Sequence, residues 1–328
     1  MRFLPTGEQA EFARTLHRLL GAADLPAAVR SWAAGEPAPG LEVWRKLAGT
    51  GLFALPVPEA YEGLGPLPVE LALAFVELGR AGMPGPVVET AAAAVLIAEL
   101  GDDVLAARFL PALAAGEAVA TLTLPGGGPY ALDAEAAGFR FAVWGDELRL
   151  SPGPGPVLPS TDPARRLSVL PAGGELLAAG PRVLAAAGAA LCWARLLTAA
   201  QCLGVGEALL TRTVDYVKQR TQFGAPVGGF QAVKHRLADT LLGLEFARPL
   251  VWAGALRLDR GDVAAAKLAA GGAAYRAAAT ALQLHGAVGY TEELDLSLWL
   301  RKARPLRDAW GTPSACRAEL LLGLPRGR

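Results

Sequence analysis

The stretch Arg220-Thr-Gln-Phe-Gly-Ala-Pro-Val-Gly-Gly-Phe-Gln231 separates two long helical patterns, and it decides how the second half of the chain folds. Its small residues and proline predict a tight turn between the helices. Arg220 and the Phe230-Gln231 pair could offer a guanidinium and an amide to a phosphate-bearing ligand. Alternatively, Arg220 only caps the C-terminus of its helix beside a glycine turn.

Apolar residues at helical spacing predict helices over 187–219, 229–258 and 262–284, and another helix from Pro313. Short loops between long helices are typical of a four-helix bundle. The apolar run Val183–Ala194 has 12 residues, whereas a membrane span needs about 20. We therefore expect a buried helix there. Its many small residues would let another helix approach closely, and we expect the bundle to make the main subunit interface.

The first 118 residues also have helical periodicity, with a loop rich in proline and glycine over 55–65. We expect helices over 69–78, over 90–100 with Thr90 as the cap, and over 102–113. Alternating β-branched and aromatic residues then predict strands. These strands are expected at 119–124, 139–144, 147–150 and 166–170, with a Gly145-Asp146 turn joining the second to the third.

The pattern as a whole predicts a mainly α protein with a small β domain. We expect an N-terminal helical domain over 1–118, a reduced middle β domain over 119–180 and a C-terminal four-helix bundle over 181–328. A chain of 328 residues exceeds what one core of about 250–300 residues holds.

Charge and composition exclude several classes of protein. Lys+Arg and Asp+Glu both number 31, so a polycationic nucleic-acid binder is disfavoured. Three cysteines without a CxxC pattern and three scattered histidines indicate neither a disulfide framework nor a metal site. The first residues lack the basic and apolar regions of a signal peptide. We expect a cytoplasmic protein that does not span a membrane.

Four segments together carry a family resemblance: Trp44–Gly65, Leu110–Glu117, Arg220–Gln231 with its R-x-Q-F-G and F-Q elements, and Gln283–Glu293, which reads Q-L-H-G-A-V-G-Y-T-E-E. In order and spacing the chain resembles the acyl-CoA dehydrogenase family. The resemblance implies FAD, an oligomer built from dimers, and α,β-dehydrogenation of an acyl-CoA thioester. It implies a carboxylate base for the α-proton and a hydride transferred to the flavin.

The resemblance also implies which residues contact the cofactor. The segment after the first bundle helix is expected to reach FAD across a dimer interface, and a later glycine segment lets backbone approach the same flavin. The residues concerned are Arg220, Gln222, Phe223, Gln231, Gly286, Gly289 and Thr312. Ala287 stands where the family usually has a second glycine.

The catalytic base of the family is missing from both of its known positions. Nine residues after Arg301 the family has a Glu followed by Gly-Thr, but here the position holds Trp310, before Gly311 and Thr312. Some members place the Glu before the arginine that matches Arg195, where this chain has Ala194. Arg195 and Gly311 would then mark the substrate region. An indole is no base, and its bulk can fill the acyl pocket.

The middle domain departs from the family as well. Where the resemblance implies T-E-P-x-A-G-S-D, the chain reads Thr123-Leu-Pro-Gly-Gly-Gly-Pro-Tyr130, without the Glu, Ser and Asp. A W-[IV]-[ST] segment has no counterpart, and the module has about half the expected length. We therefore expect a degraded half-site for the chain's own flavin and a largely intact half-site lent to a neighbour.

Other candidate residues keep three hypotheses open. Asp308 could turn into the cleft as a relocated base, whereas Glu292 and Glu293 are expected to be solvated, and Cys192 and Cys202 to be buried thiols. The leading hypothesis is a partner subunit of a heteromeric acyl-CoA dehydrogenase, as in bacterial steroid side-chain breakdown, with a Glu-bearing subunit supplying the base. The alternatives are a self-sufficient dehydrogenase and a non-catalytic flavin or acyl-CoA binder.

Overall fold

The computed structural model describes residues 4–323 and begins with a layer of helices. These are α1 (Gly7–Gly21), α2 (Leu25–Ala33), α3 (Ala38–Ala48), α4 (Pro68–Ala81), α5 (Val87–Glu99) and α6 (Asp103–Ala114), with short 3-10 turns at Leu52–Ala54 and Glu59–Tyr61. The helices expected over 69–78 and 102–113 are confirmed as α4 and α6. Helix α2, which Asp24 caps and Pro26 helps to start, was not predicted.

The expected cap at Thr90 is wrong, because α5 already begins at Val87 after Pro86. Thr90 is buried within the helix, and its hydroxyl exchanges two 3.0 Å hydrogen bonds with the backbone of Ala120. A residue that has the preferences of a helix cap thus serves here to dock the helix against the first strand.

Two small sheets follow. The larger has the order β1-β3-β4-β7, from β1 (Ala120–Thr123), β3 (Phe139–Trp144), β4 (Glu147–Leu150) and β7 (Glu175–Ala179); the smaller has the order β2-β6-β5, from β2 (Ala131–Leu132), β6 (Leu167–Ser168) and β5 (Val157–Leu158). The expected β3–β4 hairpin is confirmed, with Trp144 opposite Glu147 around the Gly145-Asp146 turn. β1 pairs with β3 in parallel.

The remaining chain is helical: α7 (Pro181–Gln219), α8 (Gln231–Arg257), α9 (Arg260–His285), α10 (Leu296–Asp308) and α11 (Pro313–Gly323). A small hairpin, β8 (Thr221–Gln222) with β9 (Ala225–Pro226), and a 3-10 turn, η3 (Val227–Gly229), join α7 to α8. Another 3-10 turn, η4 (Gly286–Tyr290), follows α9. The sequence patterns predicted α7, α8, α9 and α11, but not α10.

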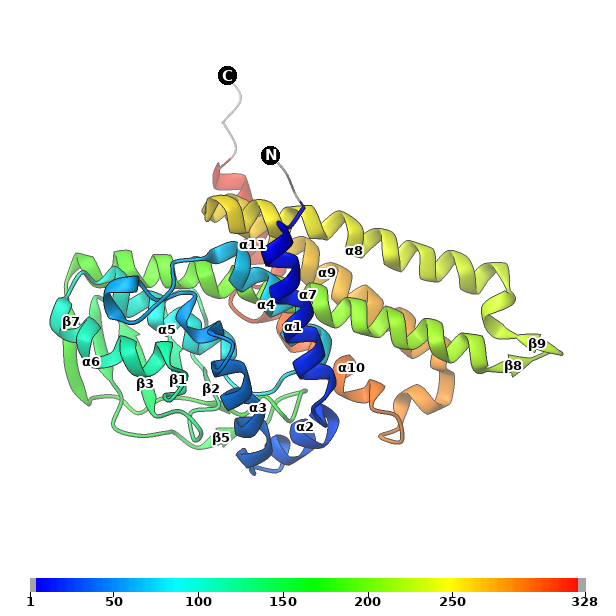
Figure 1. Cartoon of the computed structure of the whole chain (residues 1–328), viewed down its shortest axis with the longest axis horizontal. Coiled ribbons are helices and arrows are strands. Elements are labelled where there is room, and N and C mark those ends of the chain that lie inside the picture. Colours follow the sequence, from blue (N-terminus) through cyan, green and yellow to red (C-terminus); the bar gives the residue numbers. More distant parts are fainter. Residues whose placement is uncertain (1–3, 324–328) are drawn as a thin grey trace, which may run out of the picture.

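Helix α7 is the central helix of the fold. It runs from the β module at one end to the projecting β8–β9 hairpin at the other (Figure 1). Its glycines allow close packing: a Cβ on Gly204 would lie 1.9 Å from the Val76 carbonyl oxygen, and one on Gly79 would lie 2.2 Å from that of Gln201. α7 and α4 therefore touch along their backbones.

Among the described helices, α7 alone has the length and apolarity of a membrane span, but 78% of its most apolar window is buried inside the protein. This confirms the expectation of a buried helix. The small residues that we expected to admit another subunit's helix, such as Ala186 and Ala190, are buried within the chain itself. The free apolar surface instead lies on α8, where Leu242, Phe246 and Leu250 repeat every four residues.

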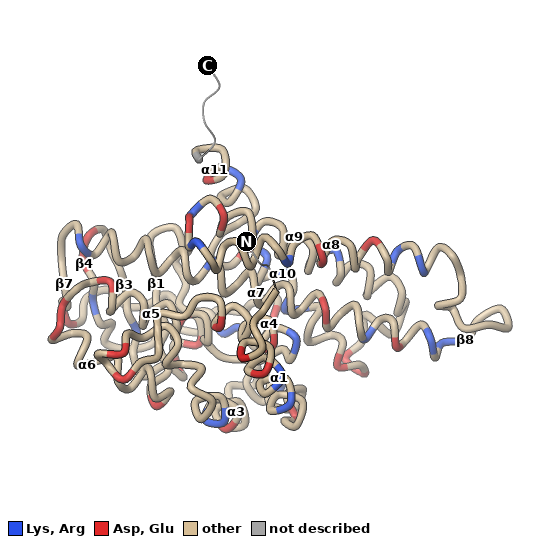
Figure 2. Tube along the Cα trace, turned by 45° about the horizontal axis from the view of Figure 1, so that its top comes forward, with Lys and Arg blue, Asp and Glu red and all other residues tan. Residues whose placement is uncertain are grey.

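Acidic and basic residues are interspersed over the described part of the trace and do not gather into one basic face (Figure 2). A protein that binds nucleic acid through phosphates needs a basic patch or stripe. The distribution of charge supports the exclusion made from composition.

Candidate functional site

Trp310, at the position of the missing base, is buried between the N-terminal helices and the loop after β1. Only 6% of the residue is exposed, and its indole Nε1 donates a 3.0 Å hydrogen bond to Oε1 of Glu89 on α5. The ring lies directly over Gly127, where an added Cβ would come within 2.5 Å of it. The indole therefore fills this space and presents no group that can take a proton.

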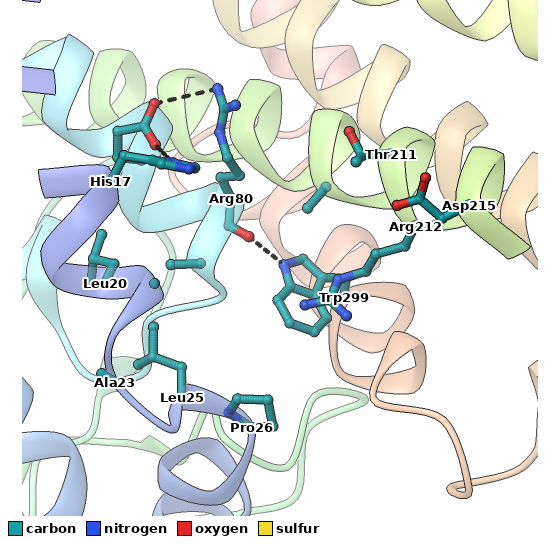
Figure 3. Close-up of a pocket in the computed structure, with 14 residues that line it drawn as sticks. His17, Leu20, Ala23, Leu25, Pro26, Arg80, Thr211, Arg212, Asp215 and Trp299 are labelled. Atoms are coloured by element: carbon teal, nitrogen blue, oxygen red, sulfur yellow. Dashed lines mark hydrogen bonds and ion pairs between the residues drawn. The ribbon is translucent and has the colours of Figure 1, made fainter. Parts of the chain in front are cut away.

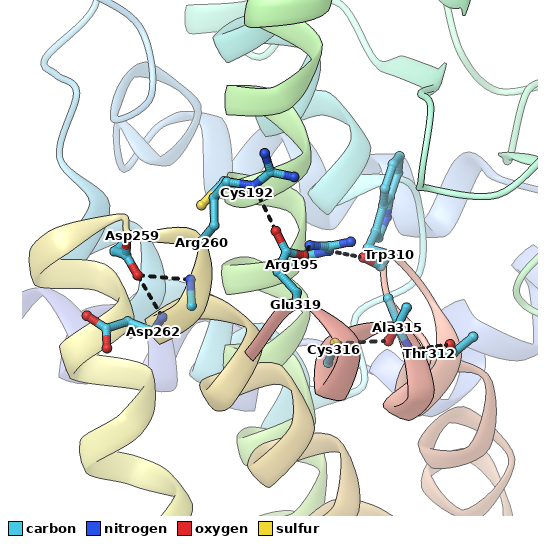
Figure 4. Close-up of polar contacts among 12 residues, drawn as sticks. Cys192, Arg195, Asp259, Arg260, Asp262, Trp310, Thr312, Ala315, Cys316 and Glu319 are labelled. Carbon is cyan, nitrogen blue, oxygen red and sulfur yellow. Dashed lines mark hydrogen bonds and ion pairs between the residues drawn. The ribbon is translucent and has the colours of Figure 1, made fainter. Parts of the chain in front are cut away.

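Two buried cations hold the loop that carries Trp310. Arg195 on α7 donates from Nε to the Trp310 carbonyl oxygen at 2.8 Å and forms an ion pair with Glu319 on α11 (Figure 4). Lys267 on α9 donates to the carbonyl oxygens of Leu306, Arg307 and Gly311, at 3.0, 2.7 and 3.2 Å. Arg195, which the family resemblance placed in the substrate region, is thus occupied in fixing the loop.

The other predicted residues at this site make local structural contacts. Ala194 is fully buried and its carbonyl accepts a 2.7 Å bond from the Thr198 hydroxyl. Thr312 uses its hydroxyl to accept a bond from the Ala315 amide, at the start of α11. A Cβ on Gly311 would lie 3.1 Å from Sγ of Cys316 and 3.2 Å from Nε of Arg195, so a larger residue here would crowd the arginine.

The acids weighed as substitutes for the base lie elsewhere. Asp308 pairs with Arg304 at 3.5 Å, with both side chains about half exposed. Glu292 pairs with Arg301 and is largely exposed, as is Glu293. Asp308 therefore does not point into the cleft beside Trp310.

Sequence reasoning missed Glu89, the acid nearest to Trp310. It is 3% exposed, and burial raises the pKa of its carboxyl group, although the positive charge of Arg165 opposes this shift. An acid near the start of the apolar helix α5 was the signal in the sequence. Lys267 was missed in the same way, as the one lysine within the alanine-rich helix α9.

A second buried acid, Asp133, lies near Glu89. Its Oδ1 accepts bonds from the Trp32 indole at 3.1 Å and the Arg166 amide at 3.2 Å, whereas its buried Oδ2 has no partner among the described residues. Burial raises the pKa of Asp133 to about 7, and the negative charge of Glu89 acts in the same direction. The residue also adopts a left-handed φ of 52°, which a non-glycine residue seldom does.

We expect the free energy of unfolding of Asp133→Asn, measured relative to the wild type, to be higher at pH 7.5 than at pH 4.5. The folded pKa of about 7 exceeds the unfolded value of about 3.9, so the wild type loses stability as pH rises between these values. The difference between variant and wild type should grow by about 2–4 kcal/mol over this interval, in urea unfolding at each pH. The exposed Asp146→Asn serves as the control, and a flat difference for Asp133→Asn would contradict the expectation.

The predicted cofactor residues other than Thr312, which lies beside the Trp310 loop, are found at the far end of the bundle. Arg220 ends α7, and its backbone amide bonds to the Tyr216 carbonyl oxygen, but its side chain is exposed. In the β8–β9 hairpin Phe223 is 93% exposed at a φ of 53°, and its ring meets Phe230 edge to face at 6.3 Å. The backbone of Arg220 therefore caps α7, as the alternative expected. Its guanidinium has no partner among residues 4–323 and remains available to a ligand.

The glycine segment lies beside this hairpin. The His285 ring stacks on Tyr216 at 4.1 Å and bonds to the Ala281 carbonyl, which joins the end of α9 to the end of α7. Gly286 is exposed and has a positive φ of 65°. Gly289 is buried, and a Cβ at this position would lie 3.1 Å from the His285 side chain. Gln222 and Gln231 are exposed nearby in sequence, at the hairpin and at the start of α8.

The two candidate regions of one chain are far apart. Arg220 follows Arg195 by 25 residues along the continuous helix α7, which corresponds to about 37 Å at 1.5 Å per residue. One small molecule cannot bridge the exposed hairpin and the Trp310 loop of the same chain at that spacing.

Comparison with known proteins identifies the family. Residues 6–117 match the model of the acyl-CoA dehydrogenase N-terminal domain, and residues 184–318 match that of the C-terminal domain. The chain is 34% identical to the acyl-CoA dehydrogenase IpdE2 of Mycobacterium tuberculosis over 306 residues, covering 91% of this chain and 92% of the relative.

Solved structures agree with this match. One is the Tcur3481-Tcur3483 steroid ACAD, at 27% identity and a TM-score of 0.79, with 95% of this chain and 96% of that one covered. The ChsE4-ChsE5 complex of Mycobacterium tuberculosis has the same fold, with a TM-score of 0.86 at 24% identity over 99% and 100% of the two chains. The chain therefore belongs to the acyl-CoA dehydrogenase family.

Proposed function

We propose that this chain is the base-lacking subunit of a heteromeric, FAD-dependent acyl-CoA dehydrogenase, in which a Glu-bearing partner supplies the base. Trp310 carries the proposal: it occupies the position of the base, it is buried, and Arg195 and Lys267 hold its loop in place. An indole that fills this space and takes no proton leaves the chain's own site unable to abstract an α-proton. The 27% identity to a steroid ACAD supports a role in steroid catabolism, with fatty-acid catabolism as the alternative, and we place the protein in the cytoplasm.

The residues at the hairpin fit FAD as a lent half-site. A free guanidinium on Arg220 suits a pyrophosphate, the amides of Gln222 and Gln231 can donate or accept hydrogen bonds, and Phe223 offers an exposed ring to an aromatic system. When bound, FAD would supply the oxidising capacity for dehydrogenation. These side chains would hold and orient it at a subunit boundary, because they face away from their own chain.

The chain's own half-site fits FAD poorly. Thr123 at the end of β1 has a buried hydroxyl without a partner among the described residues, but no Glu, Ser or Asp follows it in the loop. Trp310 covers Gly127 in that loop. We infer that the flavin contacted by this chain is bound mainly by a neighbour.

The exposed face of α8 supports an assembly through the bundle. Phe246 is 73% exposed, and Leu242 and Leu250 lie one turn away on either side. Burying such a stripe against another subunit removes apolar surface from water at about 25 cal/mol per Å². The stripe lies on the helix that follows the hairpin, and we infer that one interface covers both the apolar stripe and the lent half-site.

Co-expression tests the proposal. The chain purified alone should show no acyl-CoA oxidation in a dye-coupled assay, whereas a complex with a dehydrogenase subunit that retains Glu-Gly-Thr should be yellow and active. Ordinary turnover by a homo-oligomer of this chain would refute it. A soluble chain that binds flavin or acyl-CoA but activates no such partner would favour the non-catalytic binder.

Within the complex, Arg220→Ala is expected to weaken FAD retention by about ten- to a hundredfold. A charge-assisted contact to phosphate contributes about 1.5–3 kcal/mol, which corresponds to that range. Flavin occupancy at limiting FAD, followed by absorbance after gel filtration, gives the measurement. Arg45→Ala removes an equally exposed arginine on α3 as the control. Unchanged occupancy in Arg220→Ala would remove Arg220 from the half-site.

Under the alternative hypothesis of a self-sufficient dehydrogenase, Glu89 is the candidate for the relocated base. It is a buried carboxyl group with a raised pKa, in contact with the residue at the base position. If Glu89 were the relocated base, Glu89→Gln would lower kcat by about a thousandfold or more. The partner-subunit proposal instead expects the kcat of the complex to change little, because the partner's Glu performs the proton transfer.

A further inference from the structure

A pocket of about 560 Å³ opens on the side of α7 away from the features described so far. Helices α1, α2, α4, α7 and α10 enclose it, and Figure 3 shows the side chains that line it. The volume lies in the range of small-molecule sites. The family resemblance placed no residue here.

The pocket contains a guanidinium that the protein does not neutralise. Arg212 extends from α7 across the face of Trp299, with its guanidinium carbon 3.8 Å from the ring centroid. Its nitrogens make no hydrogen bond or ion pair with any residue between 4 and 323. Partial burial lowers the pKa of this guanidinium, and the Asp295 charge offsets the effect only in part.

Two of the acids near Arg212 are already paired with other cations, whereas Asp215, three residues further along α7, also lines the pocket and is exposed. Glu77 bonds to His17 at 2.9 Å and pairs with Arg80 at 3.3 Å. Asp295, at the start of α10, pairs with Arg30 at 2.6 Å. Arg212 is exposed to solvent and has no partner among residues 4–323, so its guanidinium is free to pair with an anion that enters the pocket.

The rest of the pocket is rigid and apolar on one side. The Trp299 indole donates a 2.9 Å bond to the Arg80 carbonyl oxygen, which fixes the ring beneath Arg212. The opposite wall consists of aliphatic groups from the ends of α1 and α2: Leu20, Ala23, Leu25 and Pro26. A ligand here would meet a charged end and an apolar end.

We propose that this pocket binds a small organic monocarboxylate, with its carboxylate on Arg212 and its apolar body against the α1–α2 wall. The planar guanidinium matches a carboxylate with two parallel hydrogen bonds. Asp215 and Glu77 also line the pocket, and their negative charges disfavour a dianion such as a phosphate monoester. The site is separate from the proposed dehydrogenase function and is tested by binding alone.

Hexanoate is the probe, and hexanamide, which has the same chain without the charge, is its control. By calorimetry on the full chain or its complex, hexanoate should bind with a Kd of about 1 mM, and hexanamide at least about tenfold more weakly. Arg212→Gln should weaken hexanoate binding about ten- to a hundredfold, because the charge-assisted contact is lost. Arg212→Lys, which keeps the charge but not the fork, should give an intermediate Kd.

The exposed Arg45→Gln on α3 controls for a general loss of positive charge. It should bind hexanoate as the wild type does. Equal affinity in the wild type and Arg212→Gln would overturn the proposal, and so would absence of wild-type binding up to about 10 mM hexanoate. If Arg212→Gln does not fold, equal affinity for hexanoate and hexanamide in the wild type would overturn it.

Discussion

Replacing Trp310 by glutamate is expected to lower the free energy of unfolding by at least about 4 kcal/mol and to leave the isolated chain inactive. Removal of a large buried aromatic side chain costs about 3–5 kcal/mol. The new carboxyl group would also lie beside the buried Glu89, where two charges cannot both be accommodated. Restoring the glutamate alone would therefore not restore a working site in this chain.

Urea unfolding and the dye-coupled assay on the same preparation check both parts of this prediction. Trp310→Phe is the matched control, since it keeps a ring over Gly127 and loses only the indole bond to Glu89. It should cost about 1–3 kcal/mol, the cost of an unsatisfied buried acceptor. A Trp310→Glu variant that is as stable as the wild type and oxidises acyl-CoA would mean that the chain's own site is intact.

Replacing Lys267 by methionine is expected to destabilise the protein by about 3 kcal/mol. Methionine keeps the volume of the side chain but leaves three carbonyl oxygens at the end of α10 without their donor. Each unsatisfied buried acceptor costs about 1–3 kcal/mol of stability. Because the variant no longer buries a charged ammonium group, part of this loss is offset. The cation also faces the negative end of the helix dipole.

Thermal and urea unfolding measure the loss for Lys267→Met, and hydrogen exchange reports on the Trp310 loop, whose amides should exchange faster. The exposed Lys46→Met on α3 is the control and should change stability by less than about 0.5 kcal/mol. A similarly small change for Lys267→Met would show that the three bonds do not hold this loop.

The helices that were predicted best are those whose own residues specify them. Helices α7, α8 and α9 have long apolar periods, and the β3–β4 hairpin has alternating strands around a Gly-Asp turn. Helix α10 was missed although it exists, because its pattern mixes five charged residues and a proline with the apolar ones. Packing of Trp299 and Leu306 against the bundle, and not local propensity, accounts for it.

The sequence by itself determined the family and the absence of a base at the two known positions, and it predicted which hairpin residues contact the cofactor. Those conclusions depend on residue types at fixed spacing along the chain. Only the tertiary structure revealed the contact between Trp310 and Glu89, which lie 221 residues apart, and the Lys267 bonds across about 40 residues. It also brought Arg212 onto Trp299 in a pocket between five helices. Such contacts arise from the packing of separate elements, and no local pattern records which element a side chain will meet.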